Sequence, residues 1–222
     1  PVSVADELAR VLPVLRGALT LGVPVSVDTC KPEVMCAALA LGADIVNDIL
    51  ALQAPGALDA VASHPTCGVC LMHMRGVPGS MQGDVRYGDV VAEVTAFLAA
   101  RAKALRDRAV DARRIVLDPG IGFGKLAGHN LELLRRQREL LAPGYPLLVG
   151  WSRKSTLGVL TGKAVGDRLA ASIAAALAAV DNGAAIVRVH DVAETVDALE
   201  VWRAARDNDA STDAVHEPPP YP

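Results

Sequence analysis

The stretch Ile115 to Lys125, IVLDPGIGFGK, constrains the fold more than any other part of the sequence. A β-branched, apolar run ends in Asp118 and gives way to a loop rich in glycine, which indicates a buried strand followed by a loop. Because the C-terminal ends of parallel strands meet at one rim in α/β folds, a polar residue at that point is expected to face a ligand. Five more apolar runs end in polar residues: PVSVD at Asp28, ADIVND around Asn47, VCLMHM around His73, PLLVGWS at Ser152 and AIVRVHD at Asp191.

The number of these units bears on the fold class. Six strand–helix units can be counted in the sequence. A closed (β/α)8 TIM barrel is built from eight such units and typically has about 250 residues. We therefore predict an α/β fold of the TIM-barrel type in which this chain supplies about six of the eight units. Because the sequence starts on a helix and at Pro1 instead of Met, we expect roughly 60 residues to precede it in the full barrel. The alternative is an open doubly wound sheet, which six strands would also satisfy.

The expected elements follow from periodicity and from the start and stop residues of helices. We expect one N-terminally incomplete barrel domain over 1–206 and a flexible, Pro-rich C-terminal tail over 207–222. The segment 75–88 is expected to be a long loop that covers the site. Helices are predicted over 3–19, 31–41, 57–62, 90–109, 131–141, 154–160, 167–182 and 194–206, and strands over 23–28, 44–47, 68–74, 115–118, 146–150 and 185–190.

Composition narrows the function. The net charge of −3 is spread over interspersed acids and bases, which argues against a nucleic-acid or membrane partner and favours a small-molecule ligand. No apolar run approaches the roughly 20 residues of a transmembrane helix, and no signal peptide is evident, so we predict a cytoplasmic protein. The four cysteines are too few for a disulfide framework and are expected to be reduced.

Strand alternation groups the candidate site residues. Residues two apart share a face of a strand, so Arg188 pairs with His190, and Asp28, Asn47 and Asp118 each end a face of their own strand. If these faces point inward, one pocket holds two carboxylates, an amide, a guanidinium and an imidazole. Such a pocket suits a nitrogen-rich heterocycle that lies beside an anion. A carboxylate can accept two parallel hydrogen bonds from the N–C–NH2 edge of the heterocycle, and Arg188 with His190 can hold phosphate oxygens. The alternative for each residue taken alone is a polar strand end or a helix cap.

Two loops add to this pocket. DPGIGFGK is not a P-loop, because Leu126 follows Lys125 where Ser or Thr is required. Its glycines are instead expected to let backbone approach a flat ligand, with Phe123 either stacked on that ligand or part of the core. In GWSRKSTLG, Lys154 and Ser155 lie at a predicted helix N-terminus, which favours a carboxylate or phosphate unless Ser155 is only an N-cap.

A zinc site is the interpretation we reject. His64, Cys67, Cys70 and His73 are spaced three apart, but Cys70 and His73 would lie on opposite faces of one strand. The four side chains could not converge without breaking that strand, so Cys70 is expected in the core.

With these residues laid out, the chain resembles the dihydropteroate synthase family from about residue 3 to 206. The blocks that carry the resemblance, in order, are VSVDT, GADIVNDI, LMHMRGVPGSMQ, LDPGIGFGK followed by HN, LLVGWSRKS and IVRVHDV. The resemblance implies a (β/α)8 barrel transferase of folate biosynthesis that joins 7,8-dihydropterin-6-ylmethyl diphosphate to 4-aminobenzoate and releases pyrophosphate. It also implies Mg2+ on the diphosphate, sensitivity to sulfonamides and a homodimer.

The resemblance also implies roles for individual residues. Asp28, Asn47 and Asp118 would hold the polar edges of the pterin, with Met72, Phe123 and Gly150 around its ring. Lys154 would contact the pterin and flank the aminobenzoate, whose carboxylate Ser155 would receive, while Arg188 and His190 would hold the diphosphate. Lys154, Arg188 and His190 are thus the expected catalytic residues, in a dissociative reaction stabilised mainly by electrostatics.

Departures from the family pattern limit these expectations. The family's NxTPDSF block, with its metal-binding Asn, and its GGESTRPG block are not in this sequence, so no metal ligand is assigned here and this chain alone is predicted to turn over poorly. Thr156 stands where a larger apolar residue is more usual. The alternatives are a methyltetrahydrofolate-binding methyltransferase barrel and a non-catalytic pterin-binding paralogue.

Overall fold

The computed structural model describes residues 2–76 and 85–206 of the chain. The predicted tail over 207–222 and most of the predicted 75–88 loop lie outside the described residues. The strands are β1 Ser26–Asp28, β2 Ile45–Asp48, β3 Gly68–Met72, β4 Ile115–Asp118, β5 Leu147–Val149 and β6 Ala184–Val187. The α-helices are α1 Val4–Ala18, α2 Pro32–Leu41, α3 Ala57–Ala62, α4 Val90–Arg106, α5 Ala127–Arg135, α6 Ser155–Thr161, α7 Leu169–Asp181 and α8 Val192–Ala204. Short 3-10 helices span η1 Leu19–Leu21, η2 Ala112–Arg114, η3 Gln137–Leu141 and η4 Val165–Asp167.

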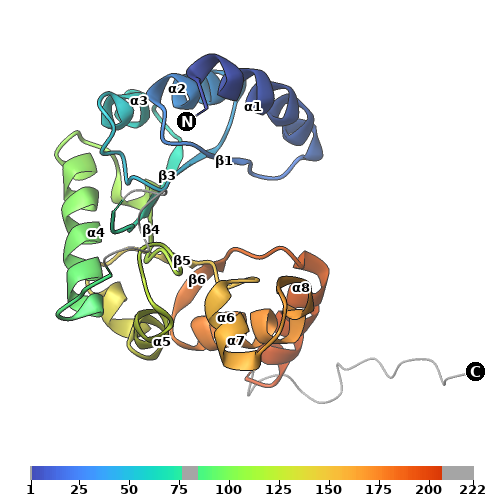
Figure 1. Ribbon diagram of the computed structural model, residues 1–222. Coiled ribbons are helices and arrows are strands. Elements are labelled where there is room, and N and C mark those ends of the chain that lie inside the picture. The colour runs from blue at the N-terminus through green and yellow to red at the C-terminus, as the bar shows by residue number, and fades with distance from the viewer. Residues whose placement is uncertain (1, 77–84, 207–222) are drawn as a thin grey trace, which may run out of the picture.

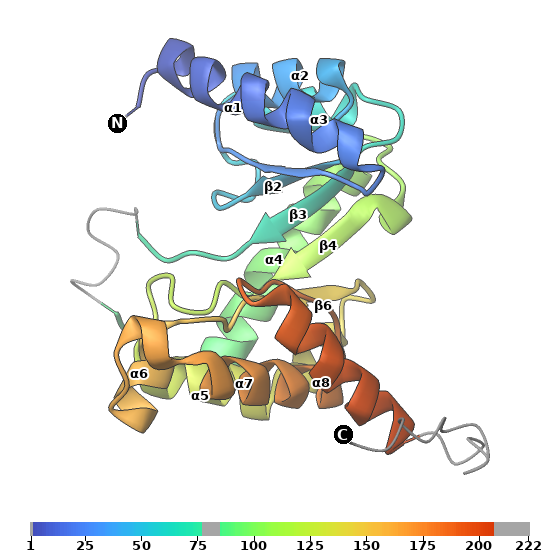
Figure 2. The same cartoon turned by 90° about the vertical axis from the view of Figure 1, so that its right-hand side faces the viewer.

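The strands form one parallel sheet whose order follows the sequence, β1-β2-β3-β4-β5-β6. The sheet curves into an open arc with the helices on its outer side (Figures 1 and 2). In a doubly wound sheet the strand order would reverse and helices would cover both faces. Neither feature occurs in the described part of the chain, so the doubly wound alternative is wrong and the arrangement is that of a (β/α) barrel.

Side-chain alternation along the strands separates the core from the inner face. Ile115 and Leu117 of β4 are fully buried and belong to the main apolar cluster, which the outer helices complete with residues such as Met35, Leu98 and Leu105. Val116, between them, lies on the inner face, as do Ile45, Cys70 and Leu148 from other strands. Alternate side chains along each strand thus pack against the outer helices, and the side chains between them point to the interior of the arc.

Side-chain caps and backbone stops define several helix ends. The Ser3 hydroxyl accepts the Asp6 N–H at 3.1 Å and caps α1. Pro32 begins α2, and Gly42 ends it with a φ of 107°, which a residue with a Cβ adopts only under strain. Asp89 caps α4 by accepting the N–H groups of Val91 and Ala92 at 2.9 and 3.1 Å.

Several predicted element ends differ from the structure; for example, the first strand begins at Ser26 and the last ends at Val187. Two of these differences have a clear physical reason. Helix α5 begins at Ala127, four residues before the predicted start, since the His129 ring accepts the Leu126 N–H, and the helix tightens into η3 after Arg136. The third strand ends at Met72 instead of residue 74 because the His73 side chain turns into a buried contact with Lys125. Both differences arise from side-chain contacts that periodicity does not record.

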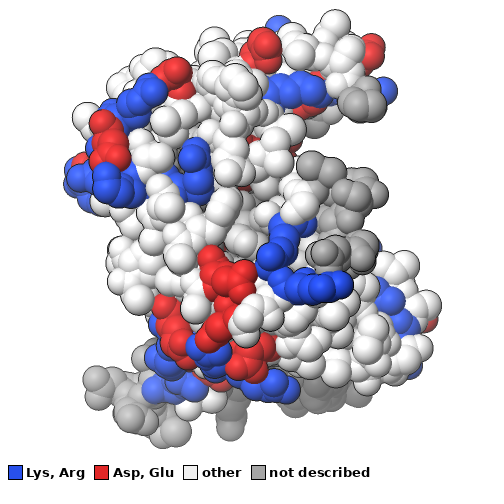
Figure 3. All heavy atoms as spheres, turned by 60° about the vertical axis from the view of Figure 1, so that its left-hand side comes forward, with Lys and Arg blue, Asp and Glu red and all other residues white. Residues whose placement is uncertain are grey.

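The outer surface around α4 carries both signs of charge (Figure 3). Arg136 pairs with Asp89 and Glu139, and Arg75 pairs with Glu93. Exposed pairs of this kind contribute little to stability, about 0–1 kcal/mol each, but they leave no extended basic field on this face. No helix in the described ranges is long and apolar enough to cross a membrane.

Candidate active site

The ends of β1, β2 and β4 place three predicted polar residues at the rim. Asp28 pairs in register with Asn47, whose side-chain amide donates to Asp28 Oδ2 at 2.9 Å. Arg188, just after β6, has its Nη2 3.9 Å from the same carboxylate. The far edges of the described sheet therefore converge at this point instead of scattering.

Asp118 is the most buried carboxylate of this group. It is 8% exposed, and its Oδ1 accepts the Gly120 N–H at 2.7 Å. Burial raises the pKa of Asp118 from its ordinary value near 3.8 to about 6, against the lowering effect of the Gly120 hydrogen bond and of nearby positive charges, Lys154 first. The carboxylate is therefore ionised at neutral pH, but its unmet hydrogen-bonding capacity makes a donor from a ligand favourable.

One pocket contains every residue that the resemblance assigns to the pterin. Its walls are Asp28, Asn47, Ile49, Met72, Asp118, Ile121, Phe123, Gly150, Lys154 and Arg188. Ile49 and Ile121 were not predicted, because an isoleucine beside a strand end gives no sequence signal that separates a ligand contact from core. Polar groups at one side and apolar side chains around them are the lining that a flat, polar-edged heterocycle requires.

Lys154 forms one wall of this pocket. It is the N-cap of α6, and its Nζ lies 4.3 Å from the centroid of the Phe123 ring, a cation–π contact. Burial lowers the pKa of Lys154, while the charge of Asp118 opposes that shift. Phe123 is half-buried beneath the ammonium, which answers the sequence alternative: the ring faces the pocket instead of the core.

Two glycines of the loop after β4 allow close contact with the backbone that follows β3, instead of the predicted contact with a ligand. A Cβ on Gly120 would overlap the His73 carbonyl oxygen, and one on Gly124 would overlap that of Arg75. Both glycines also have positive φ, 67° and 59°. The prediction that they make room for a ligand is wrong for these two, because they admit the backbone that leaves β3.

Lys125 ties the same two segments together, a role that sequence reasoning missed. Its Nζ lies 2.9 Å from His73 Nδ1 and donates to the carbonyl oxygens of His73, Gly120 and Phe123 at 3.0 to 3.2 Å. Burial lowers the pKa of Lys125 to about 7 and that of His73 to about 3. The hydrogens of the lysine are thus shared among four acceptors, the neutral imidazole and the three carbonyls, and the loop that carries Phe123 is fixed against β3.

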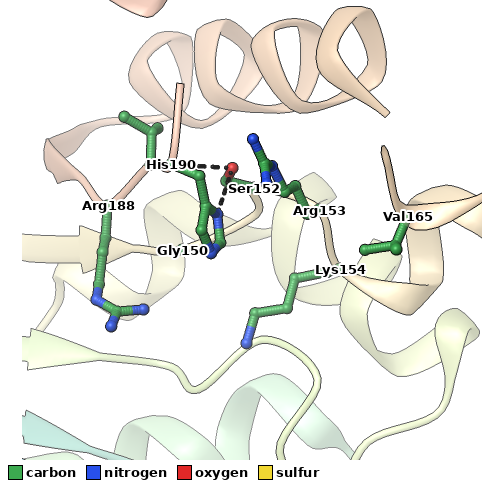
Figure 4. A pocket seen from close by; sticks show the side chains of 8 residues that line it. Gly150, Ser152, Arg153, Lys154, Val165, Arg188 and His190 are labelled. Carbon is green, nitrogen blue, oxygen red and sulfur yellow. Dashed lines mark hydrogen bonds between the residues drawn. The ribbon is translucent and has the colours of Figure 1, made fainter. Parts of the chain in front are cut away.

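A second, larger pocket adjoins the first (Figure 4). The side chains of Arg188, His190 and Lys154 reach into it, whereas Arg153 turns away to an ion pair with Asp191, Nη2 to Oδ1 2.5 Å. Gly150, Lys154 and Arg188 line both pockets, so the two are continuous. Its lining comprises Gly150, Ser152, Arg153, Lys154, Val165, Arg188, Val189 and His190.

Ser155 and Thr156 begin helix α6 beside these pockets. Ser155 is exposed and lines neither pocket, so the structure leaves its predicted aminobenzoate contact untested. Thr156 is buried, and its hydroxyl accepts the side-chain amide of Asn130 at 2.9 Å. Because Asn130 also accepts the Gly122 N–H, the polar Thr156 joins the helix to the loop after β4.

The residues of the rejected zinc arrangement have other partners. His64 accepts the Cys67 N–H at 3.0 Å, Cys67 Sγ lies 3.3 Å from an Arg114 nitrogen, and His73 contacts Lys125. Cys70 is buried at 2% exposure, and burial raises the pKa of its thiol. Within residues 2–76 and 85–206, no group of three or more His, Cys, Asp or Glu is placed to hold a metal ion.

Comparison with known proteins agrees with this geometry. Residues 1–190 match the sequence family described as pterin binding enzyme. The dihydropteroate synthase of Neisseria meningitidis serogroup B is 50% identical over 208 residues, which cover 91% of this chain and 73% of that protein. The Burkholderia cenocepacia dihydropteroate synthase, solved with 7,8-dihydropteroate, is 55% identical with a TM-score of 0.87, over 93% of this chain and 76% of that one.

A third relative was solved with a different bound molecule. The Xanthomonas albilineans dihydropteroate synthase, solved with 4-aminobenzoic acid, is 48% identical with a TM-score of 0.86, over 93% of this chain and 74% of that one. Identity at this level over most of both chains is sufficient to establish family membership. This chain belongs to the pterin-binding enzymes and, within them, to the dihydropteroate synthase family.

Proposed function

We propose that the rim of this arc condenses 7,8-dihydropterin-6-ylmethyl diphosphate with 4-aminobenzoate to give 7,8-dihydropteroate and pyrophosphate. The observation that carries the proposal is the continuity of two chemically different pockets. The enclosed one combines two carboxylates and an amide with two cations and apolar side chains, and the open one is lined by cations and an imidazole. A substrate with a polar heterocycle at one end and a diphosphate at the other matches both. Solved relatives that contain 7,8-dihydropteroate or 4-aminobenzoic acid support the small-molecule substrates.

The pterin end would lie in the enclosed pocket. The ionised Asp118 would accept hydrogen bonds from the N–C–NH2 edge of the pterin, and Asn47 and Asp28 would form hydrogen bonds with its opposite polar edge. Met72 and Phe123 lie against the ring faces, with Gly150 at the mouth. The three side chains at strand ends are held by the sheet register, so the ring is oriented before the reaction starts.

The diphosphate end would lie among Lys154, Arg188 and His190. Negative charge accumulates on the leaving oxygen as the C–O bond lengthens, and these donors stabilise it. The electron-rich pterin carries the complementary positive charge on the methylene carbon, near the carboxylates of Asp118 and Asp28. The aniline nitrogen of 4-aminobenzoate, whose carboxylate Ser155 and Lys154 would receive, then attacks that carbon, and no protein nucleophile is required.

Mg2+, a homodimer and a cytoplasmic location stay predictions from the sequence and its resemblance. Among the residues that the structure describes, no three His, Cys, Asp or Glu side chains are grouped to hold a metal ion. The steps above accordingly use only side chains of this chain.

The test is a pair of assays on the same preparation. Calorimetry measures binding of the pterin diphosphate, and a tracer assay measures pyrophosphate release that depends on 4-aminobenzoate, with a sulfonamide as competitor. Binding with release supports the proposal. Methyl transfer from methyltetrahydrofolate would favour the methyltransferase instead. Pterin binding with no release, even at the slow rate expected of this chain alone, would favour the non-catalytic paralogue.

A further inference from the structure

Ser152 lines the open pocket next to His190. It follows β5 in a turn closed by the Lys154 N–H donating to the Trp151 carbonyl at 3.1 Å, and it is 5% exposed. Its hydroxyl accepts the backbone N–H of His190 at 3.2 Å and lies 2.9 Å from His190 Nδ1 (Figure 4). The sequence pattern marks Ser152 only as a polar strand end, and neither pocket role above uses it.

The turn that carries Ser152 is held firmly. Arg153 has a φ of 60°, a conformation that costs about 1–2 kcal/mol for a residue with a side chain. Helix α7 and the residue before it stabilise this conformation: Ser172 Oγ accepts the Arg153 N–H, and Arg168 Nη1 donates to the Arg153 carbonyl, both at 3.0 Å. Strain that is sustained by these two partners fixes where the Ser152 hydroxyl points.

Counting hydrogens decides the state of the imidazole. The Ser152 hydroxyl has one hydrogen, and it already accepts from the His190 N–H. Within the described residues, His190 Nδ1 is the one acceptor in hydrogen-bond reach of that hydroxyl. The hydroxyl therefore donates to Nδ1, and a neutral His190 must carry its own hydrogen on Nε2.

We infer that Ser152 is a positioning residue that locks His190 in the Nε2–H tautomer, with that N–H directed into the basic pocket as a donor to phosphoryl oxygen. The inference rests on the proposed function for the identity of the anion. Nε2 faces the space shared by Arg188 and Lys154, because Nδ1 is turned to Ser152 (Figure 4). In this tautomer the ring donates a hydrogen bond from Nε2 to the diphosphate, beside the Arg188 and Lys154 side chains.

The tautomer is measured directly by 15N NMR of histidine-labelled protein in weakly alkaline solution, where an ordinary imidazole is neutral. For the unaltered chain we expect Nε2 to resonate as the protonated nitrogen and Nδ1 as the bare one. Ser152→Ala should yield a mixture of the two tautomers, and Ser152→Thr, which keeps the hydroxyl, should restore the single form. A protonated Nδ1 in the unaltered chain overturns the inference even if Ser152→Ala fails to fold.

The second readout uses inorganic pyrophosphate as the probe. Ser152→Ala should weaken its calorimetric affinity about five- to tenfold, the value of one lost hydrogen bond, with Ser152→Thr within about twofold of the unaltered chain. Ser63→Ala, which removes a hydroxyl at the end of α3, is the control and should change neither readout. Unchanged affinity in a folded Ser152→Ala protein contradicts the inference. A locked tautomer and weakened pyrophosphate binding without any pterin reaction would instead count against the proposed function alone.

Discussion

The two pockets of the rim differ in how they handle charge. In the enclosed pocket Asp118 is 8% exposed, and burial alters its pKa strongly. In the open pocket His190 is exposed, and so is Arg188 on the wall shared by the two pockets, where its side chain is 63% exposed. The enclosed pocket is suited to recognise a ligand through hydrogen bonds that are shielded from water. The open pocket is suited to hold an anion through several neighbouring positive side chains, which water and salt can reach.

This difference fits the order of events in a dissociative reaction. The ring that stays must be held rigidly, while the diphosphate that leaves must be released. Lys154 is the one charged residue other than Arg188 that lines both pockets, and it is half-buried where Arg188 is exposed. Variants can therefore separate the contribution of each pocket.

The largest effect is expected for Lys154→Met, because it removes the half-buried charge that both pockets share, whereas the other shared charge, Arg188, is exposed. The rate of pyrophosphate release at low substrate should fall about 100- to 1,000-fold, the scale of losing one preorganised electrostatic donor. Lys163→Met, an exposed lysine nearby, is the control and should leave the rate unchanged. Equal losses for the two variants would remove the distinction between a site lysine and a surface one.

Asp118→Asn should affect the enclosed pocket alone. Affinity for a pterin diphosphate analogue should fall by about 1–3 kcal/mol, the value of a charged hydrogen bond, while affinity for inorganic pyrophosphate stays the same. In the unaltered chain, pterin affinity should also fall as the pH drops below about 6, because Asp118 is then protonated, and the variant should lack this dependence. Asp197→Asn, on the exposed side of α8, serves as the control in the same calorimetric titrations.

The same substitution should stabilise the fold. The pKa of Asp118 is higher in the folded state than in the unfolded chain, so its ionised form costs stability above about pH 6, and that cost disappears as the pH falls toward 4. Asp118→Asn should therefore raise the free energy of unfolding at pH 7.5 by up to about 3 kcal/mol and make little difference near pH 4. Urea titrations at the two pH values measure it, and a loss of stability at the higher pH would show that the carboxylate is well solvated.

The smallest effect is expected for Arg188→Met. Pyrophosphate affinity should fall about five- to tenfold at low salt, since an exposed guanidinium is screened, and the difference should shrink as salt is added. Arg203→Met, an exposed arginine on α8, should have no such effect. A loss that does not respond to salt would mean that Arg188 acts in a dehydrated contact and that the contrast between the pockets is overstated.

Much of the fold could be predicted because several elements end at a clear boundary in the sequence. The apolar run before Asp118 forms β4, and α2 ends at Leu41, both as expected. The end of β3 could not be placed, because His73 leaves the strand to meet Lys125, and that contact joins residues 52 positions apart. Local patterns record propensity and periodicity but not such tertiary partners.

In the site, too, local patterns could be predicted from the sequence and tertiary contacts could not. The alternation that puts Asp28 and Asn47 on the inner face of their strands was enough to bring them into one pocket. Lys125 and Ser152 were missed because their roles depend on which carbonyl or ring they meet after folding. The glycines of the β4 loop were assigned to a ligand because nothing in the sequence indicates that the backbone after β3 passes against them.

The most direct test of the two-pocket account is a crystal structure of this chain with 7,8-dihydropterin-6-ylmethyl diphosphate bound. The account predicts the N–C–NH2 edge of the ring on the Asp118 carboxylate and the phosphates among Lys154, Arg188 and His190, with His190 Nε2 as the donor. A ring bound outside the pocket that contains Asp118, or phosphates held away from those three side chains, would contradict it.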